Sequence, residues 1–518
     1  MLNKVKYHNT VKKYSIILIA IVVAFSITSC KKYLDKTPID DYKVSALDYL
    51  KTEGEYRTMQ TSVYTPLQWL NQLVPIGDIA SDNSVAGGES ASDVLDLQQI
   101  DDFTLSPVNA TLANIWRYAY EGINRANYLT QHKAANPLGV PVNFAGKEAM
   151  YGEVYFLRAY YYFTLTKMYG AVPLFVDKRS DISATGTLTR APQTAVYAAI
   201  EKDLTDAIAV LPAIQTQKGR ATKYAAQALL SKVYLYQRKY DAAATMLENV
   251  ITSNAFSLVP NFNNIFLKAG ENGSESVFEI QYSSDGANSY TEADYVQGPG
   301  NYSVQQCGIR FLTATNPAMP YADGYSTNLP AQNLSNAYTA GDIRKAGTCF
   351  DIEAYKTANP GFGIVYQVAP YKNTGLYNTK YLPRKGETNT SGGAYQLNYK
   401  NNYRTMRYAE VLLMAAEANN KATAANDGKA QTYLNLVRRR AFGNTLNDIT
   451  SSGTTLYDAI LNERRLELAM EGDRYFDLVR TGKAATVLAP RFQTNKHELF
   501  PIPSLEVTIS GLTQNPGY

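Results

Sequence analysis

The sequence contains few of the residues that bind transition metals or act as nucleophiles. Only 3 cysteines and 3 histidines occur among 518 residues, and no HExxH, CxxC, GxSxG or P-loop motif is present. We therefore expect no cofactor and no histidine-rich metal site. A glycosidase that uses two carboxylates stays open, because 46 acidic residues offer many candidate pairs.

A hydrophobic run long enough to span a membrane is also missing. The longest apolar run, at 16–25, has half of the roughly 20 residues that a spanning helix needs. Four lysines precede it and small residues follow it up to Cys30, which is typical of a secretion signal over residues 1–29. The segment from Ile27 to Cys30 forms a lipobox, which predicts that Cys30 is lipidated and becomes the new N-terminus. The alternative is ordinary cleavage nearby, which leaves Cys30 as a free thiol.

The mature chain has no excess charge of either sign. Residues 1–29 contain four lysines and no acidic residue, so the remaining chain carries 46 acidic residues and as many basic ones. A nucleic-acid partner is not expected, because such proteins need a persistent basic surface. After export, Cys307 and Cys349 either form a disulfide or stay apart, since the sequence does not show whether they come close.

Helical periodicity follows a short polar tether at 30–45. Apolar residues recur at three- and four-residue spacing in 113–129 and 151–170. In the second stretch they run nearly all round the helix, which predicts that this helix is buried.

Pairs of helices similar to tetratricopeptide repeats are predicted twice. Between 219 and 257 two helices lie back to back with a turn at Arg238, and alanines stand where the helices approach each other. A similar pair is predicted at 403–420 and 428–441. Repeats of this kind stack into a curved solenoid. The predicted fold is therefore all-α dominated, with a tetratricopeptide-like helical-repeat scaffold over about 46–282 and 403–518.

The segment from about 283 to 402 is different in composition. It is rich in Gly, Pro, Asn, Ser and Tyr and has almost no helical periodicity, as in "YVQGPGNYS" and "GETNTSGGAYQ". A disordered linker normally lacks so many aromatic residues, so we predict an ordered, loop-rich lobe. Because long ordered loops on a rigid scaffold often carry binding sites, this lobe is the expected ligand-binding part of one domain over 46–518.

The stretch "NERRLELAMEGDRYFDL" places Glu463, Glu467 and Glu471 at four-residue spacing, in one row of a helix. Such a row can serve acid–base catalysis or metal binding. However, Glu467 has Arg464 and Glu471 has Arg474 three residues away, and every acid has a basic residue nearby, which favours a structural ion-pair network. Two catalytic carboxylates need separate environments that drive their pKa values apart. We therefore predict a structural role and no enzymatic activity.

Several motifs together resemble the SusD/RagB family of outer-membrane nutrient-binding lipoproteins. They are "KKYLDKTP" after the lipobox, "EVYFLRAYYYFTLTKMYGAVPL", "RATKYAAQALLSKVYLYQRKYDAA", "YRTMRYAEVLLMAAEA", "NERRLELAMEGDRYFDLVRTGKA" and the terminal "LFPIPSLEV". These motifs span nearly the whole chain in the family's order. "GDIRKAGT" at 341–348 is similar to the family's Asp-Pro-Arg element, but Ile343 replaces the proline, which leaves the identity of the ligand open.

The resemblance implies four tetratricopeptide-like helix pairs that carry a variable lobe. It also implies a lipid-anchored, surface-exposed location at the outer membrane. The implied partner is a SusC-like TonB-dependent transporter, over which the lipoprotein acts as a lid that captures oligosaccharides or, in some members, peptides. No catalysis is implied.

Candidate ligand-binding residues follow from what a sugar requires. Flat aromatic faces contact the apolar C–H patches of pyranose rings, and Asp, Asn or Arg bind the hydroxyl groups. The sequence has 41 tyrosines but only 2 tryptophans, and Trp116 lies in a helical pattern that favours the core. For Trp69 two positions are considered, the ligand pocket and the hydrophobic core. The predicted ligand contacts include Trp69 and, in the loop that follows it, Asp78, Asp82 and Asn83, which resemble the family's loop beside the ligand. Tyr290, Tyr295 and Tyr302 of the lobe are the other predicted contacts.

Functions of three classes remain: a glycan binder coupled to transport, a secreted carbohydrate-active enzyme, and a solenoid that scaffolds protein partners. The first is favoured because a tethered, helical, aromatic-rich chain without catalytic motifs agrees with the resemblance. The appearance of reducing ends during incubation with a polysaccharide separates the enzyme from the binder, and a scaffold binds no glycan.

Overall fold

The fold is seen in a computed structural model of the protein. The predicted signal, the tether with Cys30, and Tyr295 lie outside the residues that the structure describes, which are 49–180, 186, 188–291, 294, 296–388 and 392–518.

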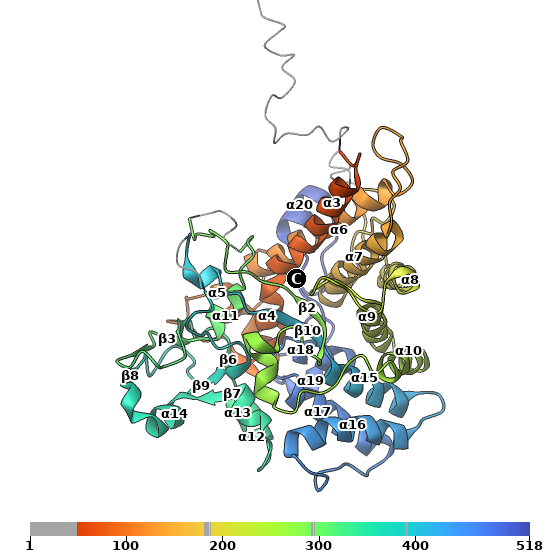
Figure 1. Ribbon diagram of the computed structural model, residues 1–518. Coiled ribbons are helices and arrows are strands. Elements are labelled where there is room, and N and C mark those ends of the chain that lie inside the picture. The colour runs from red at the N-terminus through yellow and green to blue at the C-terminus, as the bar shows by residue number, and fades with distance from the viewer. Residues whose placement is uncertain (1–48, 181–185, 187, 292–293, 295, 389–391) are drawn as a thin grey trace, which may run out of the picture.

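Long helices form the scaffold, which confirms the predicted all-α, tetratricopeptide-like fold class. Neighbouring helices pack in sequence order: α7 against α6 and α8, α9 against α8 and α10, and α15 against α10, α16 and α17 (Figure 1). The helices are α3 (Glu53–Trp69), α6 (Ala110–Gln131), α7 (Lys147–Tyr169), α8 (Gln193–Val210), α9 (Lys223–Tyr236), α10 (Tyr240–Thr252), α15 (Tyr408–Lys421), α16 (Asp427–Phe442) and α17 (Gly453–Glu467). Over the described ranges, no helix combines the length and the apolar character that crossing a membrane requires.

The α9–α10 pair shows why this sequence forms helical hairpins. Thr222 caps α9 by accepting a hydrogen bond of 3.1 Å from the backbone N–H of Ala225. Arg238 adopts a positive φ of 58° in the turn, which reverses the chain. Ala225, Ala228 and Ala243 are completely buried, because small side chains let the two helices approach closely.

Burial in the scaffold follows the predicted periodicity. The side chains of α7 are buried on nearly all sides, and Trp116 of α6 lies in the core.

The helix predicted at 403–420 begins later than expected. Its first five residues form strand β10 (Tyr403–Arg407), which pairs antiparallel with β2 (Ser276–Ile280). A short apolar run can form either a helix or a strand. Here it forms a strand, because β2 provides an edge with which it pairs.

The segment between β2 and β10 contains only short elements, which lie at the left of Figure 1. β3 pairs with β5 in parallel, and β4 with β8, β7 with β9, and β1 with β6 pair antiparallel. Cys307 and Cys349 are buried free thiols, so they do not form the disulfide that export would permit. The elements are α11 (Tyr302–Cys307), α12 (Gln332–Ala337), α13 (Arg344–Thr348), α14 (Ile352–Ala358), β3 (Ile309–Arg310), β4 (Thr313–Ala314), β5 (Asp323–Gly324), β6 (Leu329–Pro330), β7 (Cys349–Asp351), β8 (Ile364–Val365) and β9 (Leu376–Asn378).

Further short elements join the lobe to the scaffold. The turn from α17 to α18 lies against α4, and Gly472 in this turn comes so close to Gly77 that a side chain at Gly77 would collide with the backbone of Gly472. α4 and the turn before α18, which are far apart in the sequence, are therefore in direct backbone contact. These elements are α4 (Leu73–Ile79), β1 (Ser84–Val85), α5 (Leu95–Asp101), α18 (Arg474–Arg480), α19 (Ala484–Val487) and α20 (Ser504–Ser510).

The glutamate row of α17 is part of a buried ion-pair network. Glu463 pairs with Arg344 at 2.6 Å, and Glu467 pairs with Arg344 at 3.1 Å and with Arg407 at 3.0 Å. Glu471 pairs with Arg407 at 2.7 Å, but it lies in the turn after α17 because the helix ends at Glu467. The neutralised, buried carboxylates agree with the predicted structural role.

Asp477 pairs with Arg480 at 2.7 Å as the spacing predicts, but other partners in this network differ from the predicted ones. Arg464 pairs with Asp477 at 3.0 Å and with Glu410 at 3.4 Å instead of with Glu467. Arg474 pairs with Asp82 at 2.7 Å instead of with Glu471. The reason is that these side chains are packed between elements, where charges from distant parts of the chain come closer than the neighbours three or four residues away.

Candidate functional site

Four tyrosines of the lobe gather at one place, and we call Tyr290, Tyr302, Tyr325 and Tyr395 the tyrosine cluster. The rings of Tyr290 and Tyr302 lie 6.5 Å apart at 76°, and those of Tyr302 and Tyr325 lie 6.4 Å apart at 73°. The hydroxyl groups of Tyr290 and Tyr325 are 2.9 Å apart and share a hydrogen bond. Tyr290 is 42% exposed, so the cluster presents an aromatic surface to solvent.

The backbone around the cluster is held by buried polar contacts. Tyr302 begins α11, and Asn301 caps this helix by accepting a hydrogen bond of 3.2 Å from the N–H of Ser303. The Asn301 side chain also donates to the carbonyl oxygen of Asn401 at 2.9 Å. The N–H of Tyr325 donates to the carbonyl oxygen of Gln305 at 2.8 Å. These contacts fix Tyr302 and Tyr325 before any ligand arrives, which reduces the entropy cost of binding.

Charged groups border the tyrosine cluster. The Tyr395 hydroxyl donates to Asp323 at 3.1 Å, and burial together with the charge of Asp323 raises the pKa of Tyr395 to about 12. Tyr395 therefore stays protonated at neutral pH. Arg310 pairs with Glu89 at 2.6 Å and with Asp93 at 3.4 Å, and so connects the lobe to the loop before α5. Asp323, Arg310 and Glu89 offer acceptors and donors of the kind that sugar hydroxyls use.

A cavity of about 210 Å³ lies behind Tyr302. Trp69 is only 8% exposed. Its ring and that of Tyr118 are in edge contact with centroids 5.7 Å apart, and the Arg125 guanidinium lies 5.1 Å from the centroid of the Trp69 ring. The cavity thus brings together Trp69 and Tyr302, which the sequence predicted as ligand contacts from segments far apart in the chain. The lining residues are Trp69, Gln72, Val94, Leu95, Asp96, Leu97, Thr111, Asn114, Ile115, Tyr118, Val296, Tyr302 and Gln306.

Asp78, Asp82 and Asn83 are not among the residues that line the cavity behind Tyr302. Asp78 is completely buried and accepts hydrogen bonds from the N–H of Gly472 at 2.9 Å and from Asn328 at 3.1 Å. Asp82 pairs with Arg465 at 3.0 Å, and Arg465 also donates to Asn83 at 2.9 Å. The carboxylates of Asp78 and Asp82 and the Oδ1 of Asn83 thus have partners within the protein, whereas the Asn83 Nδ2 has none among the described residues. Ligand binding by these three residues stays a prediction, and in the structure they connect α4, the lobe and the turn before α18.

Asp78 gives a pH-dependent prediction for stability. Burial raises its pKa from 3.8 to about 7, although Asn328 and Gly472 lower it in part. The folded protein thus binds a proton at Asp78 that the unfolded chain has released, so the contribution of Asp78 to stability falls as the pH rises between about 4 and 7. We expect the free energy of unfolding of Asp78→Asn to improve relative to wild type over this range, measured by urea denaturation at several pH values. A constant difference would contradict the prediction.

Sequence reasoning missed several residues of the site. Phe311 is 62% exposed, has a positive φ of 54°, and carries the Arg310 guanidinium 5.1 Å from its ring centroid. Tyr325 lies in "YADGYS", a stretch recognised as part of the lobe by its composition, and Tyr395 lies in a similar stretch. Composition could have suggested both tyrosines. Their assembly around Tyr302 depends on folding of the lobe, which the sequence pattern does not show.

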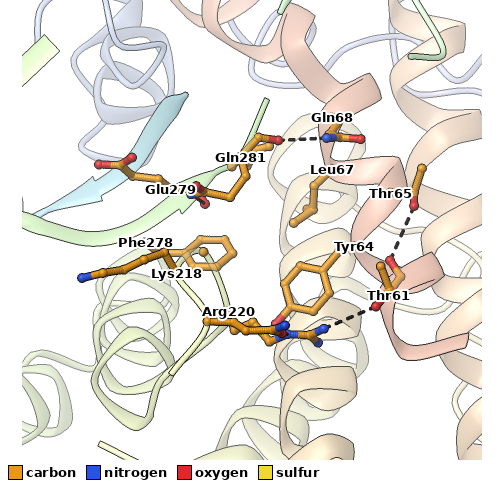
Figure 2. Close-up of a pocket in the computed structure, with 13 residues that line it drawn as sticks. Thr61, Tyr64, Thr65, Leu67, Gln68, Lys218, Arg220, Phe278, Glu279 and Gln281 are labelled. Atoms are coloured by element: carbon orange, nitrogen blue, oxygen red, sulfur yellow. Dashed lines mark hydrogen bonds between the residues drawn. The ribbon is translucent and has the colours of Figure 1, made fainter. Parts of the chain in front are cut away.

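A larger cleft lies elsewhere, between α3, the loop before α9 and β2. It has about 470 Å³, and Figure 2 shows the residues that line it. Its polar groups have partners within the protein: Gln68 donates to the carbonyl oxygen of Gln281 at 2.9 Å, and Arg220 donates to Thr61 at 3.3 Å (Figure 2). Arg220 also donates to Glu153 at 3.1 Å. Although this cleft is larger, the tyrosine cluster with its cavity is the better candidate, because it combines an exposed aromatic ring with several polar groups.

Two family models match the chain. The model described as "SusD family" matches residues 274–518, and the model described as "Starch-binding associating with outer membrane" matches residues 32–235. Together they cover most of the chain and include both the scaffold and the lobe.

Individual relatives match this chain along nearly its full length. "SusD-like protein P2" of Formosa agariphila is 28% identical, covering 98% of this chain and 100% of the relative. The solved structure of a "Laminarin binding SusD-like protein" is 33% identical, covers 90% of this chain and 100% of its own, and superposes with a TM-score of 0.80. Surface glycan-binding protein A from Bacteroides thetaiotaomicron in complex with laminarihexaose is 28% identical, with coverage of 90% and 99% and a TM-score of 0.77.

Proposed function

The chain belongs to the SusD family, and we propose that it is a surface glycan-binding protein that holds oligosaccharides on the tyrosine cluster. The observation that carries the proposal is the exposed ring of Tyr290 in edge contact with the buried ring of Tyr302, bordered by Asp323 and Arg310. An aromatic platform surrounded by hydrogen-bonding groups matches the alternating apolar and hydroxyl faces of a sugar.

Laminarin-type glucans are the first ligands to test. Two solved relatives bear names that mention laminarin or laminarihexaose, and both cover nine tenths of this chain. We expect the purified mature protein to bind laminarin and laminarihexaose in titration calorimetry. Unrelated neutral polysaccharides serve as controls for non-specific binding. Absence of binding to every glycan tested would contradict the proposal.

The protein is proposed to act without catalysis. The glutamates of α17 are neutralised by arginines inside the scaffold, where a substrate has no access, and the relatives are described by what they bind. Incubation of laminarin with the protein should therefore release no new reducing ends. Release of reducing ends that disappears on mutation of a carboxylate would identify an enzyme instead.

We place the protein at the outer membrane, anchored by lipid on Cys30, with residues 1–29 removed and residues 30–45 as a tether. The lipobox and the name of the family model over residues 32–235 support this location. A SusC-like TonB-dependent transporter is the proposed recipient of the glycan, with the protein as its lid. In this division of labour the helical scaffold, about 46–282 and 403–518, carries the binding lobe at 283–402.

Lipidation predicts the behaviour of one variant. Cys30→Ser removes the thiol that forms the thioether to lipid, so the protein should move from the membrane fraction to the soluble fraction. Thr28→Ala keeps a small residue in the lipobox and should remain with membranes. Fractionation followed by immunoblotting measures both variants. Tight membrane association of Cys30→Ser would contradict lipid anchoring at this residue.

A further inference from the structure

One phenylalanine of the lobe points outward against the pattern of its own strand. Ile309 in β3 is completely buried, and in a regular strand Phe311 would share its face, because side chains two residues apart point to the same side. Instead, Phe311 is 62% exposed, and Leu312 is buried in the core of the lobe. The backbone causes this reversal, because the positive φ of 54° at Phe311 interrupts the extended conformation between β3 and β4.

This conformation of Phe311 is costly for an aromatic residue. Bulky side chains rarely adopt a positive φ, because the side chain then comes too close to the backbone. The exposed ring also gains little of the free energy that burial of an apolar side chain provides. Strained residues of this kind are concentrated at ligand sites, where the surrounding structure holds them in place.

Hydrogen bonds on both sides of Phe311 hold its ring in this position. The N–H of Arg310 donates to Ser326 Oγ at 3.0 Å, and the carbonyl oxygen of Arg310 accepts from the N–H of Gln367 at 3.0 Å. After Phe311, β4 pairs antiparallel with β8. The Arg310 guanidinium lies 5.1 Å from the centroid of the Phe311 ring. The ring is thus positioned before any ligand arrives, which reduces the entropy cost of binding.

Arg310 also connects Phe311 to the tyrosine cluster. Its Nη1 donates to the carbonyl oxygen of Tyr325 at 3.3 Å, and the Tyr325 hydroxyl shares a hydrogen bond with that of Tyr290. The same guanidinium pairs with Glu89, whose side chain is 62% exposed. Phe311 and Tyr290 are therefore two exposed rings that are linked through polar groups of the kind that sugar hydroxyls bind.

We propose that Phe311 is a second aromatic platform of the glycan site, so that the bound glycan extends from Tyr290 past Arg310 to Phe311. The inference rests on the proposed function and deepens it, because it assigns the ligand as an oligosaccharide of several units. One sugar of the chain stacks on Tyr290 and another on Phe311, each with its apolar face against the ring. A disaccharide then occupies only part of the site.

A protein partner is the alternative ligand for this surface. Val365 and Val368 in the neighbouring segment are 64% and 61% exposed, so Phe311 is not the only apolar side chain presented there. A glycan is favoured, because the contacts of Arg310 make Phe311 continuous with the proposed sugar site. If the surface serves a protein partner instead, variants of Phe311 will bind glycan like wild type.

Variants that remove or enlarge the ring test the platform. Phe311→Leu keeps an apolar side chain without a ring, and we expect it to weaken binding of laminarihexaose about fivefold, within the range of single aromatic contacts. Phe311→Trp enlarges the ring and should bind at least as tightly as wild type. Val365→Ala is the matched control, since it shortens an exposed apolar side chain of the same area and should not change the affinity. Titration calorimetry measures all four proteins.

A glycine variant separates binding from stability. Glycine adopts a positive φ without strain, so Phe311→Gly should melt close to or above the temperature of wild type. Its affinity for laminarihexaose should nevertheless fall about as far as that of Phe311→Leu. A merely structural role of Phe311 predicts the opposite, a lower melting temperature with unchanged affinity of the folded protein.

Chain length gives an independent readout. A disaccharide with the linkage of laminarihexaose is too short to use both platforms in this account, and the tyrosine cluster alone should hold it. Its affinity should therefore be the same in wild type and in Phe311→Leu. An equal loss of affinity for the disaccharide and the hexasaccharide would overturn the extended site.

The failures can be told apart. If the Phe311 variants bind laminarihexaose like wild type while Tyr290→Ala is weakened, the inference is wrong but the proposed function holds. If wild type binds neither laminarihexaose nor laminarin, both the inference and the laminarin proposal fall. If Val365→Ala is weakened as much as Phe311→Leu, the loss does not come from the ring and the second platform is overturned.

Discussion

Replacing Glu467 with glutamine is expected to lower the free energy of unfolding by about 3–5 kcal/mol, the cost of removing one partner from a buried ion pair. Glu467 is completely buried and pairs with Arg344, Arg407 and Arg440. Burial alone would raise its pKa, but Arg440, Arg407 and Arg344 outweigh burial and hold the pKa far below its usual range. The glutamine variant leaves these buried guanidinium groups without their shared counter-charge.

Urea denaturation of wild type and variant measures this loss. Asp458→Asn is a matched control, because Asp458 pairs with Lys483 on the surface, where an ion pair contributes about 0–1 kcal/mol. A carboxylate with a lowered pKa stabilises the protein above its unfolded pKa, here 4.5, and the contribution is lost as the pH falls further. The difference between wild type and Glu467→Gln should therefore shrink in acid below about pH 4.5.

Glycan affinity should be almost unchanged in folded Glu467→Gln, since Glu467 lies in the buried network and not in the lining of the cavity behind Tyr302. A tenfold loss of affinity without any change in stability would contradict the structural role of α17. It would place the glutamate row in the binding site.

Replacing Tyr290 with alanine should weaken binding of laminarihexaose about tenfold, which corresponds to roughly 1.4 kcal/mol. The Tyr290 ring is the exposed member of the tyrosine cluster, and its removal deletes both the platform and the hydrogen bond to Tyr325. Aromatic contacts contribute about 0.5–1.5 kcal/mol beyond the area they bury. The fold should survive, because Tyr290 lies at the surface.

Tyr290→Phe is the control for this variant, because it keeps the ring and removes only the hydroxyl that meets Tyr325. We expect it to retain most of the affinity. Calorimetry gives the affinities, and circular dichroism verifies the fold of both variants. If Tyr290→Ala binds like wild type, the cluster is not the platform, although membership of the SusD family would stand.

The helical scaffold could be predicted from sequence because its causes are local. The buried alanines of α9 and α10 and the cap at Thr222 are all visible within a few residues of chain. The strand at Tyr403–Arg407 could not be predicted in this way, because it forms only where β2 provides a partner more than a hundred residues away. Hydrophobic periodicity shows which face of a helix or strand is buried, but it does not show which other element packs against that face.

Charged and aromatic partners show the same limit. Spacing along one helix suggested Arg464 as the partner of Glu467, whereas the structure pairs Glu467 with Arg344, which is 123 positions away. The family resemblance drew attention to the segment around Arg344, and the structure shows that it completes the buried network. Similarly, Trp69 and Tyr302 were predicted separately, and only folding brings them to one cavity.

A crystal structure of the protein with laminarihexaose tests the central claim most directly. The account predicts sugar density against the ring of Tyr290, over the tyrosine cluster. Density in the cleft between α3 and β2 shown in Figure 2, with none at the tyrosine cluster under saturating ligand, would contradict it.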